Sequence, residues 1–302
     1  MGAGQNAGGG AGESSLDFVR LICPTNDIVL GESFPVEVKM IFTTVENAEP
    51  PKLSLEGFVL GKVSASEPSR TRIGDKIYGV VTWKMAVNAA KAGSLPFGPA
   101  EINAIVKVPS RRGRGGFDMD PFGMFAERKR VTLRTPTNTI HVVLPPAAGR
   151  PPDFAGAVGQ FRMVASLSPT NVAVGDPITL KVQIAGHGNL DQLPMPGLED
   201  PSGFKLYDPR SEIQTTDTIG LEGVKSFEQV VIAERADVPV FPRLRFSYFD
   251  PELRQYKTLV HEPTPITVRG APATQAAPSR VATGTESAPA PAPTPAVDKL
   301  RH

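Results

Sequence analysis

Apolar and polar residues alternate along much of this chain. In the run "ITLKVQI" (178–184) every second residue is aliphatic, and the residues between them are threonine, lysine and glutamine. The same period of two continues from Ile77 through Trp83 to Val87. A period of two places successive side chains on opposite faces, so these runs predict half-buried β-strands. The 29 glycines and 31 prolines fall largely between such runs, which predicts short strands joined by turns.

This strand pattern occurs twice. The matching segments are "CPTNDIVLGESFPVEVKM" (23–40) with "SPTNVAVGDPITLKVQI" (168–184), "AAKAGSLPFGP" (89–99) with "AERADVPVFPR" (233–243), and "VTLRTPTNTIHV" (131–142) with "KTLVHEPTPITV" (257–268). Matched positions lie about 144 residues apart up to Phe97, which falls on Phe241, and about 126 apart in the last pair. A repeat of this length predicts two homologous domains. The first copy then carries an insertion of about 18 residues within 108–130.

Strands at this spacing, without a helical period, predict two tandem immunoglobulin-like antiparallel β-sandwich domains. Trp83 and its counterpart Phe227 are the expected core anchors. The expected divisions are a flexible lead (1–15), a first domain (16–145) with its insertion near 108–130, a proline-rich joint (146–156), a second domain (157–269) and a disordered proline- and alanine-rich tail (270–302). We expect the joint to be extended and stiff, because four prolines lie within 144–156.

Composition narrows the functional classes. The net charge of +1 gives no overall attraction to nucleic acid or to a membrane surface. The single cysteine, Cys23, excludes a disulfide within the chain, and we expect it to be structural or incidental. No apolar run reaches the roughly 18 residues that span a bilayer, and no apolar signal-peptide core follows Met1.

Candidate chemistry is sparse in the sequence. The four histidines show no metal-ligand spacing, and no serine stands in a Gly-x-Ser-x-Gly motif. "GHGN" (186–189) lacks the lysine and the following helix of a phosphate-binding loop, since Pro194 and Pro196 come soon after it. We interpret "GHGN" as a turn in which glycine and Asn189 adopt positive φ. We therefore predict no catalytic, cofactor-binding or metal-binding residues, no cofactor, and no enzymatic activity.

The insertion is the candidate binding element. It combines an arginine–glycine run with five large apolar residues, which are costly to leave in water on a surface loop. The candidate partner-binding residues are Arg111, Arg112, Arg114, Phe117, Met119, Phe122, Met124 and Phe125. A solvated loop and an RNA-binding loop are the alternatives for this segment.

Several ordered motifs resemble the BatD family, the oxygen-tolerance proteins of bacterial Bat (aerotolerance) operons. These are "VGQFRMVASLSPTNVAVGDPITLKVQIAGHGNLDQLPMPGL" (158–198), "GFKLYDP" (203–209), "KSFEQVVIAERADVPVFPRLRFSYFDPELRQYKTL" (225–259) and "DMDPFGMF" (118–125) before "RKRVTLRTPTNTIHVVLPP" (128–146). The resemblance covers about residues 16–268. It implies tandem immunoglobulin-like domains that face the periplasm from the inner membrane, with a signal peptide before them and a membrane helix after them. The sequence shows neither, so we expect a fragment or a soluble variant.

The resemblance also implies a role without catalysis. It suggests a periplasmic scaffold that binds membrane-bound von Willebrand factor A-domain Bat proteins and, indirectly, a MoxR-type AAA ATPase, in aerotolerance or envelope stress. No nucleic-acid partner is expected. The alternative function is a carbohydrate- or cell-surface-binding β-sandwich module, which would need outward-facing aromatic residues. Tyr248 and Tyr256 are the only ones that we expect to face outward.

Overall fold

The protein is almost entirely β-structure. A computed structural model describes residues 16–109 and 126–270. Within these ranges the chain forms strands, turns and one 3-10 turn, η1 (Leu190–Gln192), and no α-helix. Nearly all strand pairs are antiparallel, so the prediction of an all-β, largely antiparallel fold is confirmed. The expected flexible lead, the centre of the insertion and the expected disordered tail lie outside the described residues.

Residues 16–143 are called the first half below. Its strands are β1 (Leu16–Ile22), β2 (Asp27–Val29), β3 (Ser33–Phe42), β4 (Val45–Ala48), β5 (Lys52–Leu55), β6 (Phe58–Ala65), β7 (Ser69–Ile73), β8 (Lys76–Ala89), β9 (Gly93–Pro109), β10 (Ala126–Arg134) and β11 (Asn138–Val143). One sheet has the order β1-β3-β8-β6, with β7 also paired to β8. The other has the order β10-β9-β11-β2, with β4 and β5 on β9.

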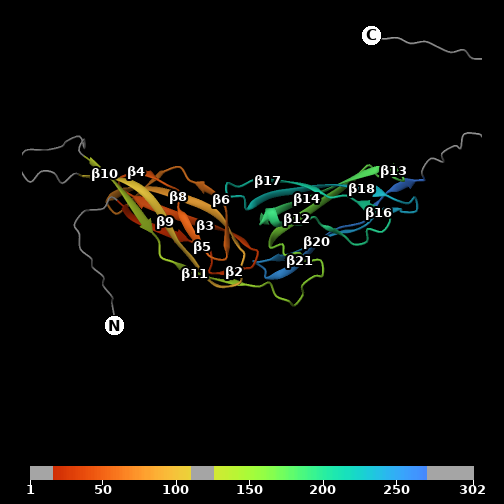
Figure 1. Cartoon of the computed structure of the whole chain (residues 1–302), viewed down its shortest axis with the longest axis horizontal. Helices are drawn as coiled ribbons and strands as arrows, with labels where there is room; N and C mark the ends of the chain where they lie inside the picture. The colour runs from red at the N-terminus through yellow and green to blue at the C-terminus, as the bar shows by residue number, and fades with distance from the viewer. Residues whose placement is uncertain (1–15, 110–125, 271–302) are drawn as a thin grey trace, which may run out of the picture.

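Residues 157–269 are called the second half. Its strands are β12 (Gly159–Ser168), β13 (Asn171–Ala173), β14 (Pro177–Gly188), β15 (Gly197–Leu198), β16 (Phe204–Leu206), β17 (Arg210–Thr215), β18 (Glu222–Ala233), β19 (Val240–Phe241), β20 (Leu244–Asp250), β21 (Gln255–His261), β22 (Thr264–Pro265) and β23 (Thr267–Arg269). Its main sheet, β12-β14-β18-β16 with β17 on β18, has the same order as the first sheet of the first half. The two halves follow one another along the long axis of the molecule (Figure 1).

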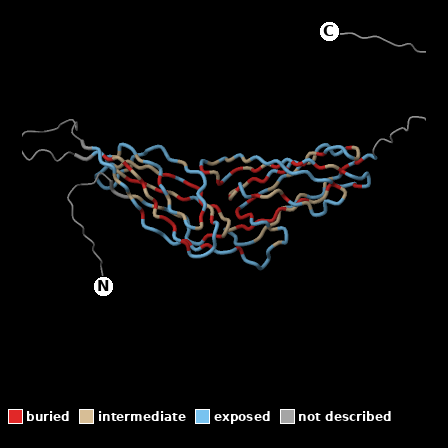
Figure 2. Tube along the Cα trace, in the orientation of Figure 1, coloured by how far each residue is buried: buried red, intermediate tan, exposed pale blue. Residues whose placement is uncertain are grey.

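Each half has its own hydrophobic core between its sheets, and the two main cores share no residue. Figure 2 shows buried segments running through the interior of both halves. The alternation of the sequence explains this, because Ile178, Leu180, Val182 and Ile184 are all at most 1 % exposed. Trp83 pairs with Val38 on β3, and Phe227 pairs with Val182 on β14, so the two predicted anchors occupy equivalent buried places.

Two short strand pairs depart from the antiparallel arrangement. β2 runs parallel to β11, and β13 runs parallel to β23. In each half a Pro-Thr-Asn segment separates a long strand of one sheet, β1 or β12, from a short strand of another sheet, β2 or β13. The short strand then pairs with the last strand of its half in the same direction. These two pairs are local exceptions within the largely antiparallel fold.

The "GHGN" segment belongs to a strand, and its interpretation as a turn is wrong. Gly186, His187 and Gly188 complete β14, where they pair with both β12 and β18. Asn189 has a negative φ of −81°. Glycine is required at position 186 because a Cβ there would overlap the backbone carbonyl of Gln160 on β12. The turn comes later, at η1, before the two prolines.

The joint between the halves is folded against the second half, so the prediction of an extended spacer is wrong. Arg150 donates from Nε to the Tyr256 hydroxyl (3.1 Å) and from Nη2 to the carbonyl of Pro145 (3.2 Å). Tyr256 donates its hydroxyl to the carbonyl of Pro146 (2.7 Å), and its ring contacts Phe154 edge to face. These contacts hold the joint on the β20–β21 hairpin.

Cys23 lies half-buried against the first core, and burial raises the pKa of its thiol to about 11. We expect iodoacetamide at pH 8 to alkylate it about 100-fold more slowly than the same residue in the urea-unfolded chain, because the raised pKa lowers the thiolate fraction by about that factor. Mass spectrometry of a labelling time course measures this. Equal rates in the folded and unfolded chains would contradict it.

Candidate functional site

The two halves contact one another through two apolar clusters. Val29, at the end of β2, packs with Val158 and Phe249 of the second half. Ala86 on β8 packs with Ile219 and Leu221, which both lie just before β18. All six residues are less than 10 % exposed. These clusters make the junction a buried contact in which the two halves are held against each other.

A carboxylate also lies at this junction. Glu32 accepts the backbone N–H of Val29 (2.8 Å). Burial raises the pKa of Glu32, although this hydrogen bond and the nearby positive charge of Arg254, on the β20–β21 hairpin, favour the ionised form. Asp176 accepts the N–H of Ala173 (2.8 Å) at the equivalent place in the second half, where it is exposed. The junction therefore buries a turn-stabilising acid that its repeat leaves in solvent.

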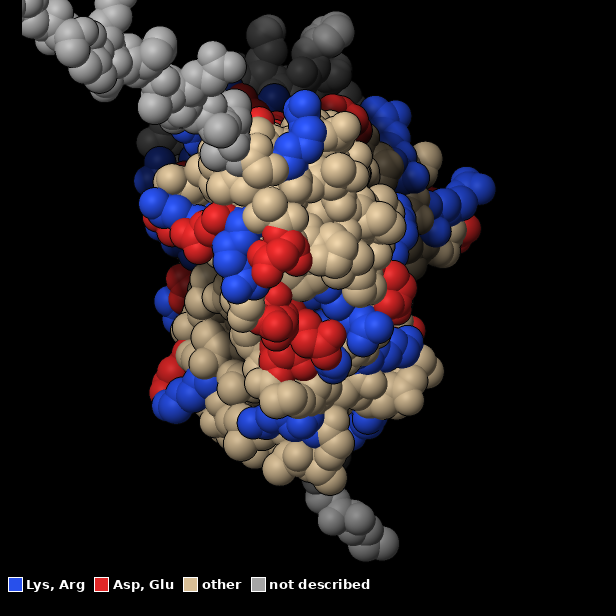
Figure 3. All heavy atoms as spheres, turned by 90° about the vertical axis from the view of Figure 1, so that its right-hand side faces the viewer, with Lys and Arg blue, Asp and Glu red and all other residues tan. Residues whose placement is uncertain are grey.

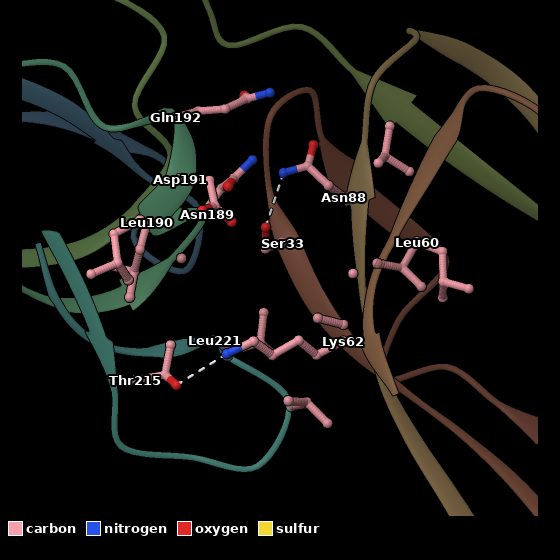
Figure 4. A pocket seen from close by; sticks show the side chains of 18 residues that line it. Ser33, Leu60, Lys62, Asn88, Asn189, Leu190, Asp191, Gln192, Thr215 and Leu221 are labelled. Carbon is pink, nitrogen blue, oxygen red and sulfur yellow. Dashed lines mark hydrogen bonds between the residues drawn. The ribbon is translucent and has the colours of Figure 1, made fainter. Parts of the chain in front are cut away.

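A cleft of about 360 Å³ lies beside these contacts, and both halves line it. The first half contributes the start of β6, the end of β8 and Ser33, and the second half contributes η1, the end of β17 and residues 219–221. Figure 4 shows polar side chains from the two halves, including Asn88, Asn189 and Gln192, directed toward the shared space. Sites between domains with a few polar groups among apolar ones are common ligand and partner sites.

The wall from the first half is shaped by a β-bulge in β6. Leu60 pairs with Val87, and the next pair is Val63 with Met85, so Gly61 and Lys62 both lie opposite Ala86. A bulge redirects the side chain next to it. Lys62 extends across the cleft and donates to the Thr215 hydroxyl (3.3 Å), which links the two halves (Figure 4).

The wall from the second half is fixed by a buried lysine. Lys225 is 6 % exposed, and its ammonium donates to the carbonyls of Asp191 and Leu193, both at 2.8 Å. Its Nζ also lies 5.4 Å from the centre of the Phe227 ring. Burial lowers the pKa of Lys225, and the negative charge of Asp191 opposes that shift. The lysine thereby holds η1 and the chain after it in place.

Replacing Lys225 with methionine is expected to lower the free energy of unfolding by about 2–3 kcal/mol, because two carbonyl oxygens lose their donor. Urea denaturation measures this, and amide hydrogen exchange at 190–193 should become faster. Lys181→Met is the control, since Lys181 forms only an exposed ion pair with Glu228 (3.7 Å) and should change stability by less than about 1 kcal/mol. A Lys225→Met protein as stable as the control would contradict the anchoring role.

A second hollow lies at the same end of the second half, beside β12, β14 and β20. Its buried carboxylate, Asp250, accepts the N–H groups of Glu252 and Leu253 and the ammonium of Lys257 (2.8 Å). Burial alone would raise the pKa of Asp250, but these hydrogen bonds outweigh it and keep the pKa below its usual value. Asp250 is therefore occupied in closing the β20–β21 hairpin.

Titratable side chains line the second hollow, among them His187, Glu222 and Glu252. Among residues 16–109 and 126–270, no group of three or more His, Cys, Asp or Glu side chains could hold a metal ion. His141 is exposed and contacts Ser94 (2.9 Å), and His261 contacts Thr264 (3.2 Å). His187 lies in the second hollow. The cleft between the halves instead offers mainly side-chain amides and apolar surface.

All eight residues predicted to bind a partner, Arg111 to Phe125, lie outside the described residues. The hairpin of β9 and β10 leads to this segment, and the equivalent hairpin, β20–β21, closes between Asp250 and Gln255. The sequence reasoning missed the cleft. The sequence contains one signal for the cleft. The stretch from Phe58 to the next proline is longer than the stretch from Phe204 to the next proline.

The aromatic surface differs from the expectation. Tyr248 is 4 % exposed and packs against Phe161 and Phe246, so its expected outward position is wrong. Tyr256 is held in the joint. Tyr207 is a substantially exposed aromatic side chain, at 44 %. A carbohydrate platform of stacked aromatic rings gains no support from this surface.

Charge on the far end of the second half is mixed. Figure 3 shows acidic and basic side chains interspersed over this face. Arg243 illustrates this, with Glu199 at 3.5 Å and Glu262 at 2.9 Å. This end therefore offers no single-sign surface to a charged partner.

A family model described as a BatD DUF11 like domain matches residues 165–268. The second half therefore contains a BatD-family domain. The match covers most of the second half, from within β12 to within β23. The BatD resemblance of the first half rests on the motifs quoted above. No curated protein matches the chain. Within the described ranges, no helix of this protein has the length and hydrophobicity to cross a membrane.

Proposed function

We propose that this protein is a non-enzymatic scaffold that binds other proteins at the periplasmic face of the inner membrane. Its partners are membrane-bound von Willebrand factor A-domain Bat proteins, and through them a MoxR-type AAA ATPase. Its role lies in aerotolerance or envelope stress. Its BatD-family domain supports a place in a Bat-type complex.

The lining of the cleft between the halves supports a binding function. The cleft between the halves is lined by sheet edges, amides and aliphatic side chains from both halves. Of the two charged residues that line it, Lys62 donates to Thr215 across the junction, and the backbone carbonyl of Asp191 accepts from Lys225. Such a surface recognises an extended or protruding partner segment through backbone and apolar contacts.

Affinity capture tests the scaffold role. The full chain, tagged at its C-terminus, is incubated with detergent-solubilised membranes of a bacterium that carries a Bat operon, and bound proteins are identified by mass spectrometry. We expect von Willebrand factor A-domain proteins to be enriched at least about tenfold over a tag-only control. Absence of these proteins from the bound fraction would refute the proposed partners.

A further inference from the structure

Strand β6 is an exposed sheet edge. Its counterpart in the second half, β16, is much shorter, so the fold does not require a long edge strand at this place. β6 has eight residues, whereas its counterpart β16 has three and is followed by Pro209. After β16 the chain is also tied to the sheet, since the Tyr207 carbonyl accepts from Gln229 (2.8 Å). A short strand is one usual protection of a sheet edge, and the eight-residue β6 lacks it, although Pro68 follows β6 just as Pro209 follows β16.

β6 also exposes apolar side chains. Val59 is 57 % exposed, Leu60 41 % and Val63 43 %. Within the described part of the chain, β6 pairs with β8 alone, so its outer backbone edge has no strand beside it. An unpaired edge with apolar side chains is the surface that strand addition uses, because backbone hydrogen bonds supply affinity and the side chains supply specificity.

The positive charge of this edge favours an acidic partner segment. Residues 58–76 contain four cations, Lys62, Arg70, Arg72 and Lys76, and two acids, Glu67 and Asp75, which gives a net charge of +2. None of these cations forms an ion pair with another described residue. The equivalent residues 204–222 contain two cations and four acids, a net charge of −2. A second copy of the chain would place cations against cations, whereas an acidic segment would neutralise them.

We propose that β6 binds an extended, acidic segment of a partner protein as an added strand, with apolar side chains of that segment against Val59, Leu60 and Val63. One end of the segment enters the cleft, where Lys62 pairs with one of its carboxylates. This inference rests on the scaffold function and adds to it the place of contact and the chemistry of the partner.

A peptide of alternating valine and glutamate, labelled with fluorescein, is the probe, and fluorescence anisotropy with the full chain is the measurement. We expect this peptide to bind at least about tenfold more tightly than its counterpart with lysine for glutamate. The Lys62→Glu variant should lose most of this preference for the glutamate peptide over the lysine peptide. Lys205→Glu is the matched control, because Lys205 lies exposed on β16, and it should bind the peptide like the wild type. Hydrogen exchange should slow at 59–63 and remain unchanged at 204–206.

Three outcomes would overturn the inference: no binding of the acidic peptide at millimolar concentration, equal binding by Lys62→Glu, or a dimer of the full chain in sedimentation that Leu60→Asp dissolves. The capture experiment separates the two proposals. If the wild type captures Bat proteins and the Leu60→Asp, Lys62→Glu variant captures them equally, the edge is not the contact and the scaffold role stands. If the wild type captures none while the peptide results hold, the named partners fail and the acidic-strand site stands.

Discussion

Replacing Phe97 with alanine is expected to lower the free energy of unfolding of the first half by about 3–5 kcal/mol, because it leaves a large cavity in a closely packed interior. Phe97 is fully buried, and its ring lies 5.1 Å from that of Phe58 and 6.1 Å from that of Phe34. Because the two main cores share no residue, the calorimetric transition of the second half should stay near its original temperature.

Two further variants control this experiment. Phe241→Ala, the counterpart in the second half, should shift the other transition. Ile77→Ala removes a side chain that is 62 % exposed and should change stability by no more than about 0.5 kcal/mol. If Phe97→Ala lowered both transitions equally, the halves would unfold as one unit and the independence of their cores would be refuted.

Replacing Gly186 with alanine is expected to destabilise the second half by about 2–4 kcal/mol, because backbone must move to make room for one methyl group. The added Cβ would overlap the carbonyl of Gln160 on β12. Gly186 also pairs with Gly223 on β18, where a Cβ would overlap the carbonyl of Gln214. Urea denaturation followed by circular dichroism measures the loss.

Gly197→Ala is the comparison for this substitution. Gly197 lies on β15 with open space around its Cα, and its replacement should cost no more than about 0.5 kcal/mol. If Gly186→Ala were as mild as Gly197→Ala, the close approach of β12 to β14 would not be what requires glycine there.

Periodicity predicts the strands well because it follows directly from the two faces of a strand. The alternating positions of β14 are buried as expected, and Phe97 and Phe241 occupy equivalent core places. The same rule would have placed Tyr248 correctly, since it alternates with Leu244 and Phe246, which face the core. The alternation along β20 therefore predicts a buried Tyr248, and the structure agrees.

Other features depend on segments distant in the sequence, which a local pattern does not contain. "GHGN" resembles a turn until β12 and β18 are placed on both sides of it. The proline content of the joint favours an extended chain. The joint is folded instead because Arg150 donates to the hydroxyl of Tyr256, 106 residues later. The cleft exists only because two halves meet, so no single run of residues could predict it.

The parallel pairing of β2 with β11 and of β13 with β23 determines how this protein carries tension. The described chain begins at one end of the long axis and finishes at the other (Figure 1). A pull between these ends acts along the strands, so in each half it loads the hydrogen bonds of the short parallel pair in shear, and they break together rather than one by one. Force applied to the two ends would thereby pass through the first and last strands of each half while the cores stay folded.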